Sequence, residues 1–180
     1  MAQEPDEIQR EAENPKDKFV RADASDDPGS GPRGEPSEER DRARTVAHRY
    51  LAHKPRTEQE VRRRLDRAEV PSSVVEDLIY ELREQGYVDD EAYAREFASQ
   101  RDQRDYGPYR VEKDLRGRGV APETIDAAIA EVFDREALRK TVRELARTRW
   151  SRYQKDEDAR RRKKKVHDYL ARRGFPFDLI

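Results

Sequence analysis

The chain has 180 residues, of which 33% are hydrophobic and 44% are charged, and it contains no cysteine. The lack of cysteine excludes disulfides, thiolate zinc sites and cysteine nucleophiles. No segment approaches the roughly 18 to 20 apolar residues that a membrane span needs, and the first residues, MAQEPDEIQR, show no basic region followed by an apolar run. We therefore expect a soluble cytoplasmic protein with an elongated or modular fold rather than one large core.

The net charge of -1 hides an uneven distribution. Residues 1–40 carry 6 Lys and Arg against 12 Asp and Glu, residues 41–134 carry 17 against 21, and residues 135–180 carry 16 against 7. The C-terminal part is thus strongly basic and is the part that a polyanion would contact.

The first predicted segment, residues 1–39, is a disordered acidic tail. Its apolar residues are few, and residues 26–36 read DDPGSGPRGEP. Such a composition buries too little surface to offset the entropy lost on ordering.

From Ser37 onward, apolar residues recur at spacings of three and four, which is typical of amphipathic helices. Residues Thr57 to Glu60 form a capping box, which predicts a helix start. Residues that break helices separate the predicted elements, at Pro55, Pro71, Gly86, 106–108, 119–122 and 174–176. The sequence therefore predicts an all-α fold.

An internal repeat is the strongest signal in the chain. Six apolar residues recur at a constant offset of fifty: Val61, Leu65, Val70, Val75, Ile79 and Leu82 match Val111, Leu115, Val120, Ile125, Ile129 and Val132. A third copy lies fifty-five residues further on, at Val166, Leu170, Gly174, Phe175 and Ile180.

Each copy has the pattern of a short helix, a tight turn, a second helix and a third helix. We expect tandem three-helix, helix-turn-helix-like repeats in an elongated, curved array. The predicted repeats are residues 40–105 with a leading helix, 106–153, and 154–180, the last being basic and incomplete at Ile180.

Catalytic groups are scarce. The three histidines, His48, His53 and His167, include no pair at the i, i+4 spacing of two metal ligands on a helix. Acidic clusters at residues 89–91 and 156–158 stand where helices should begin, and carboxylates there stabilise the helix dipole. We predict a protein without catalytic activity, metal or cofactor.

The basic run at residues 160–165 is the main functional signal. Six consecutive cations cannot share one helix face and repel one another, which indicates a partner of opposite charge. Nucleic-acid phosphates fit, with Trp150 and Tyr153 available for base stacking. The candidate nucleic-acid-binding residues are Arg149, Arg152, Arg160, Arg161, Arg162, Lys163, Lys164, Lys165, Arg172 and Arg173. The alternative for this run is a solvated face, which could fold back on the acidic tail. Arg62 to Arg64 form a smaller cluster, which we interpret as a solvated face.

Four motifs resemble a known family: Ala47-His48-Arg49-Tyr50-Leu51, Arg56 to Val61, Gly86-Tyr87-Val88-Asp89-Asp90 with Tyr93-Ala94, and Tyr169 to Phe175. The family is RecX, small bacterial proteins that bind the recombinase RecA, and the resemblance covers about residues 43–180. It implies an array of three-helix repeats that lies in the groove of a RecA filament on single-stranded DNA. There it would restrain filament growth, ATP hydrolysis and strand exchange, within homologous recombination, DNA repair and the SOS response.

The resemblance offers no catalytic residue. Its motif residues are best interpreted as fold-forming: Gly86, Tyr87, Asp89, Asp90, Tyr93, Phe97, Gly174 and Phe175. We expect a monomer whose partners are RecA and single-stranded DNA, with no membrane. Two alternatives remain open. One is a helix-turn-helix transcription regulator, although no helix combines Arg, Asn and Gln for base recognition. The other is a protein-only adaptor that uses the concave surface of stacked repeats.

Overall fold

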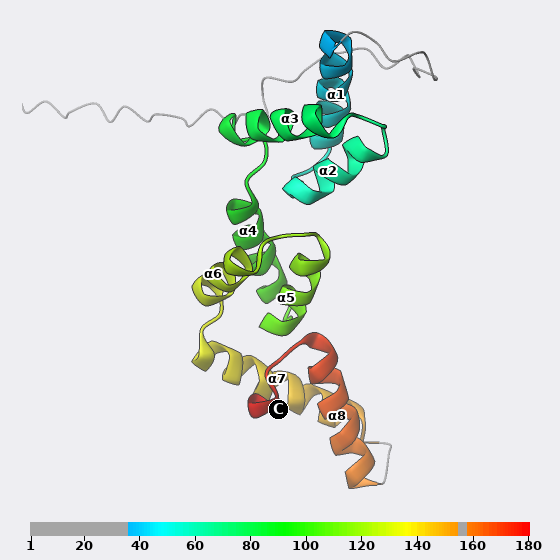
Figure 1. The fold of residues 1–180 in the computed structure, drawn as a ribbon. Coiled ribbons are helices and arrows are strands. Elements are labelled where there is room, and N and C mark those ends of the chain that lie inside the picture. The colour runs from blue at the N-terminus through cyan, green and yellow to red at the C-terminus, as the bar shows by residue number, and fades with distance from the viewer. Residues whose placement is uncertain (1–35, 155–157) are drawn as a thin grey trace, which may run out of the picture.

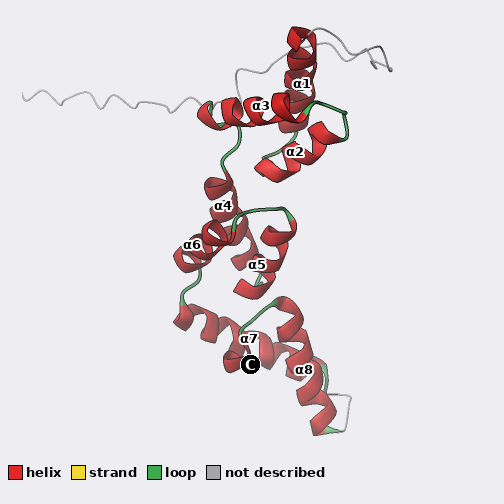
Figure 2. Cartoon of the chain, in the orientation of Figure 1, coloured by secondary structure: helices red, strands yellow, loops and turns green. Residues whose placement is uncertain are grey.

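The structure, a computed structural model, describes residues 36–154 and 158–180. Every regular element in these residues is helical, which confirms the all-α prediction (Figure 2). The elements are α1 (Pro36–Leu51), α2 (Glu58–Asp66), α3 (Ser72–Glu84), α4 (Asp90–Asp102), α5 (Pro108–Gly117), α6 (Pro122–Val132), α7 (Arg135–Arg152), α8 (Ala159–Arg173) and the 3₁₀ turn η2 (Phe177–Leu179). None of these helices is long and apolar enough to cross a membrane.

The predicted acidic tail lies outside the described residues up to residue 35. Its last four residues differ from the prediction, because α1 begins at Pro36. Glu38 and Glu39 lie in the first turn of α1, where carboxylates interact favourably with the helix dipole.

Each of three hydrophobic cores holds together three consecutive elements. The cores belong to α1–α3, to α4–α6, and to α7, α8 and η2, which we call units 1, 2 and 3. This confirms three tandem three-helix units, but the packing divides the chain one helix earlier than the predicted boundaries at residues 105 and 153. The reason is α4: Ala94 and Ala98 are fully buried against Val111 and Leu115 of the following helix, so α4 opens unit 2.

The tight turn after the second helix is the same in all three units. The carbonyls of Leu65, Leu115 and Leu170 each accept a hydrogen bond from the backbone N–H five residues later, at 3.2, 3.2 and 3.3 Å. The residue before that N–H has a positive φ each time: 58° at Glu69, 83° at Gly119 and 84° at Gly174. These bonds close the helix ends, so the repeat in the sequence is a repeat of backbone geometry.

Acidic side chains begin three of the helices. Asp89, Asp134 and Asp158 are the N-cap residues of α4, α7 and α8, each accepting from a backbone N–H at 2.8 Å. Thr57 caps α2 in the predicted capping box with Glu60. Asp89 and Asp158 therefore have the predicted capping role, while Asp156 and Glu157 of the second cluster lie outside the described residues.

Neighbouring units meet end to end through their second helices. Thr57 Oγ1, at the start of α2, donates to the carbonyl of Arg118, just beyond the end of α5, at 2.8 Å. At the next junction, Gly107 N–H donates to the carbonyl of Arg173 at 2.8 Å, and Tyr109 N–H to that of Gly174 at 3.0 Å. Helices α2, α5 and α8 therefore follow one another along one side of an elongated molecule (Figure 1), and we call this row the column.

Candidate nucleic-acid interface

The predicted basic run forms the N-terminal half of α8, and the helix turns its cations to different sides. Val166 and Leu170 are buried in the core of unit 3. With about 100° between successive residues, the face opposite to them carries exposed cations. These are Arg160, Arg161, Lys164, Lys165 and Arg172, with Lys163 exposed at the edge.

Arg162 lies on the inner side of α8. Its guanidinium lies over the ring of Trp150, 4.7 Å from the centroid, and its Nε is buried without a hydrogen-bond partner. Arg162 thus packs α8 against α7, and Trp150, 39% exposed, is partly covered by it. Among the predicted contacts, Arg162 is poorly placed to reach a phosphate.

Arg173 and Arg149 also have internal partners. The Arg173 guanidinium donates to the carbonyls of Arg104 and Asp105, at 2.6 and 2.8 Å, and so ties the end of α8 to the end of α4. Arg149 lies 3.9 Å from the centroid of the Tyr169 ring. Arg152, in contrast, is exposed in the last turn of α7.

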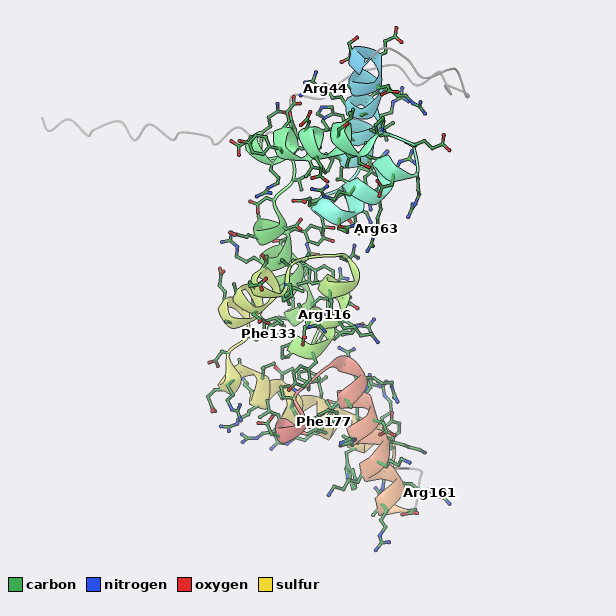
Figure 3. All side chains as sticks on the ribbon, in the orientation of Figure 1. Arg44, Arg63, Arg116, Phe133, Arg161 and Phe177 are labelled. Atoms are coloured by element: carbon green, nitrogen blue, oxygen red, sulfur yellow. The ribbon has the colours of Figure 1, made fainter. Side chains whose placement is uncertain are left out.

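The structure adds cations from the other two units to the same column. Arg63 and Arg64 are exposed on α2, Arg67 is exposed just beyond its end, and Lys113 and Arg116 are exposed on α5. Figure 3 labels one from each unit: Arg63, Arg116 and Arg161. Exposed cations therefore occur in all three units rather than on α8 alone, although Arg116 pairs with Glu112, Arg161 pairs with Asp158, and the acid Asp66 is exposed on α2.

The Arg62 to Arg64 cluster, interpreted from sequence as a solvated face, divides between two roles. Arg62 forms ion pairs with Glu58, at 2.9 Å, and with Glu76. Arg63 and Arg64 point outward on α2. Arg63 Nη1 also donates to the carbonyl of Gly117 at 3.4 Å, so of the three arginines only Arg64 has no hydrogen bond or ion pair within the chain among the described residues.

The third helices carry the opposite charge. On α3 the exposed acids are Glu76, Asp77 and Glu84, and on α6 they are Glu123, Asp126 and Glu131. On both third helices exposed acids outnumber exposed cations, of which α3 has one, Arg83, and α6 has none. A polyanion is attracted to the column and repelled from α3 and α6.

A second basic stripe was missed in the sequence. Lys140, Arg143 and Arg147 are exposed on α7 at positions i, i+3 and i+7, opposite to the buried Leu138 and Val142. The spacing of three and four is the signal that could have found them. Because the stripe faces away from the core that α7 shares with α8, it points to a different side from the cations of α8.

The geometry of the column supports electrostatic contact with a polyanion. Within residues 36–154 and 158–180, no group of three or more His, Asp or Glu side chains is placed to hold a metal ion. The fold-forming motif residues lie where they can shape the chain: Gly86, with φ of 71°, follows α3, and Phe175 is 1% exposed. Tyr87, Tyr93 and Phe97 are half-buried between units 1 and 2.

Family models match consecutive parts of the chain in the order of the units. The first three-helix domain of RecX matches residues 43–82, the second matches 89–129 and the third matches 139–180. Together the three ranges cover more than half of the chain, and they follow the units defined by the cores.

Several curated proteins and solved structures are similar to the chain. The regulatory protein RecX of Geobacillus kaustophilus (strain HTA426) is 33% identical over 134 residues, which are 73% of this chain and 48% of the relative. That of Leuconostoc mesenteroides is 30% identical over 139 residues, 77% of this chain and 51% of the relative. The chain spans about half the length of these curated relatives.

Two crystal structures share the fold. One of regulatory protein RecX superimposes with a TM-score of 0.70 at 28% identity, over 79% of this chain and 70% of the other. One of RecX from Lactobacillus salivarius superimposes with a TM-score of 0.71 at 22% identity, over 79% of this chain and 92% of the other. The arrangement of units therefore recurs in solved proteins.

Proposed function

Since the chain belongs to the RecX family of regulatory proteins, we propose that it binds the RecA recombinase and its filament on single-stranded DNA. In this proposal it acts as a cytoplasmic, non-catalytic monomer that restrains filament growth, ATP hydrolysis and strand exchange.

The observation that carries the proposal is the basic column. Its exposed cations occur on α2, α5 and α8, so a strand lying along the column meets phosphate contacts in every unit. Such contacts do not depend on base sequence, and they weaken as salt rises because binding releases counterions from the strand.

The charges of α3 and α6 argue against a duplex-binding transcription regulator. In a three-helix unit of helix-turn-helix type, the third helix enters the major groove. Here the exposed faces of these helices carry acids, such as Glu76 on α3 and Asp126 on α6, which phosphates repel. A protein-only adaptor would not require cations sorted onto one column.

A titration of the DNA-dependent ATPase of RecA with the full chain tests the proposal. We expect inhibition at low salt that weakens as salt is added. A variant that removes one column cation from each unit, Arg64→Ala with Lys113→Ala and Lys164→Ala, should inhibit less. Its affinity for single-stranded DNA should depend less on salt, with the slope of log affinity against log salt reduced by about 2.

The matched control is Lys140→Ala with Arg143→Ala and Arg147→Ala, which removes the same charge from α7. It should retain more inhibition than the column variant. Absence of inhibition by the unmodified chain at a several-fold excess over RecA in low salt would refute the proposed function.

A further inference from the structure

A hollow of about 520 Å³ lies where units 1 and 2 meet. Its walls come from the α1–α2 loop, the α3–α4 loop and the first turns of α4. Aromatic side chains of Tyr87, Tyr93 and Phe97 line it, and the last two rings are nearly parallel, with centroids 6.2 Å apart. Its volume falls in the usual range for small-ligand sites, roughly 300 to 1,000 Å³.

Two cations stand on the unit 1 side of the hollow. Lys54 is exposed, and the Arg56 guanidinium lies 4.0 Å from the centroid of the Tyr50 ring. Arg56 Nε is buried without a hydrogen-bond partner. Neither cation forms an ion pair with a side chain that the structure describes, so both can accept an anionic ligand.

The hollow borders the basic column through Arg118. The guanidinium of Arg118 lies 5.3 Å from the centroid of the Phe97 ring and donates to Glu60 of α2 at 2.7 Å. Arg118 therefore links α2 of the column to an aromatic ring of the hollow at the junction of α2 and α5.

At the second junction the corresponding positions of α7 carry no rings. Asp89 and Asp134 are the N-cap residues of α4 and α7, which aligns the two helices. Four and eight residues after Asp134 stand Leu138 and Val142, both buried and aliphatic, where α4 has Tyr93 and Phe97. The pair of rings on α4 is thus not repeated at these positions of α7.

We propose that this hollow binds one nucleotide of single-stranded DNA, with the base against the aromatic rings and the phosphate at Lys54 and Arg56. Rings and unpaired cations side by side match the two chemical parts of a nucleotide, since bases stack on aromatic side chains and phosphates pair with cations. An apolar protein side chain would leave the cations unused and partly desolvated. The inference rests on the proposed binding of single-stranded DNA.

The test uses the full chain without RecA and a thymidine oligonucleotide that carries one 2-aminopurine. Binding should change the fluorescence of the 2-aminopurine as its base stacks in the hollow. Ala92→Phe fills the hollow from an exposed position on α4. It should abolish the fluorescence change and weaken binding about tenfold. Lys54→Ser should weaken binding and lower its salt dependence.

The matched control is Ala130→Phe, which adds the same ring at an exposed position on α6. It should bind as the unmodified chain does, and circular dichroism should show all variants folded. If Ala92→Phe and Ala130→Phe bind the oligonucleotide alike, the inference is wrong. If Ala92→Phe weakens binding to RecA but not to DNA, the hollow holds a protein side chain, which also overturns it.

The two proposals fail separately. A stacking signal that Ala92→Phe abolishes, together with no effect of the unmodified chain on the RecA ATPase, would refute the proposed function and support the hollow. ATPase inhibition by the unmodified chain without a stacking signal would support the proposed function and refute the binding of a nucleotide in the hollow.

Discussion

The close approach of units 2 and 3 at Gly174 can be tested by adding a single methyl group. An ideal Cβ at Gly174 would lie 2.2 Å from the backbone N of Arg110 and 2.6 Å from its Cβ, so Gly174→Ala must move unit 3 away from α5. The φ of 84° adds strain of about 1 to 2 kcal/mol for any residue with a Cβ.

The movement would also break the backbone bonds of the junction. Gly107 N–H donates to Arg173 at 2.8 Å and Tyr109 N–H to Gly174 at 3.0 Å. Leaving a buried polar group unsatisfied costs about 1 to 3 kcal/mol. With the backbone strain added, we expect Gly174→Ala to lower the free energy of unfolding of unit 3 by at least about 3 kcal/mol.

Urea unfolding followed by tryptophan fluorescence measures this change in unit 3, because the one tryptophan of the chain, Trp150, lies in α7. The matched control is Gly86→Ala. The φ of Gly86 is also positive, at 71°, but its added Cβ meets nothing within 4 Å. That variant should lose only the strain of about 1 to 2 kcal/mol, measured by circular dichroism. Equal losses in the two variants would show that units 2 and 3 are not in close contact.

Three further predictions concern Thr57, the pair Arg172 and Arg173, and Asp90. Thr57→Ala should cost about 1 to 2 kcal/mol in urea unfolding because it removes both a helix cap and a junction bond from a fully buried side chain, and Thr57→Ser should recover most of it. Arg173→Ala should destabilise the chain, whereas Arg172→Ala should leave its stability unchanged and weaken DNA binding; the reverse order would contradict the assigned contacts. Burial raises the pKa of Asp90 above its ordinary 3.8, so the folded state binds this proton at higher pH than the unfolded chain does, and stability is lost as the pH rises through the raised pKa. Asp90→Asn should remove that loss from the profile of melting temperature against pH. If the profiles of the variant and of the unmodified chain run parallel, the assigned effect of Asp90 is wrong.

The helices and the repeat register could be predicted from sequence because local rules set both. Leu65, Leu115 and Leu170 recur at constant offsets since each must be buried and each must end a helix in the same turn. The unit boundaries could not, because a repeat fixes a period but not which helix closes which core. The assignment of α4 depends on Ala94 and Ala98 packing against α5, a contact between residues distant in the sequence.

Only part of the candidate interface could likewise be predicted from the sequence. The basic run showed where positive charge gathers, and helix periodicity around Val166 accounts for the inward position of Arg162. The role of Arg173 depends on carbonyls at Arg104 and Asp105, almost seventy residues earlier, which no local pattern indicates. That Lys54 has no ion-pair partner among the described residues likewise depends on which acids fold near it.

The net charge of -1 conceals the property on which the proposed function depends. Cations of α2, α5 and α8 face one side, while acids of α3 and α6 face another. Screening at physiological salt limits charge interactions to about 8 Å, which is less than the diameter of a helix with its side chains, about 10 to 12 Å. A strand on the column is therefore attracted by that column, and it meets the acids only if it moves across the unit. Because the attraction and the repulsion act in separate places, the two charges do not cancel. They confine a polyanion to one side of the chain and leave the remaining sides for contact with protein.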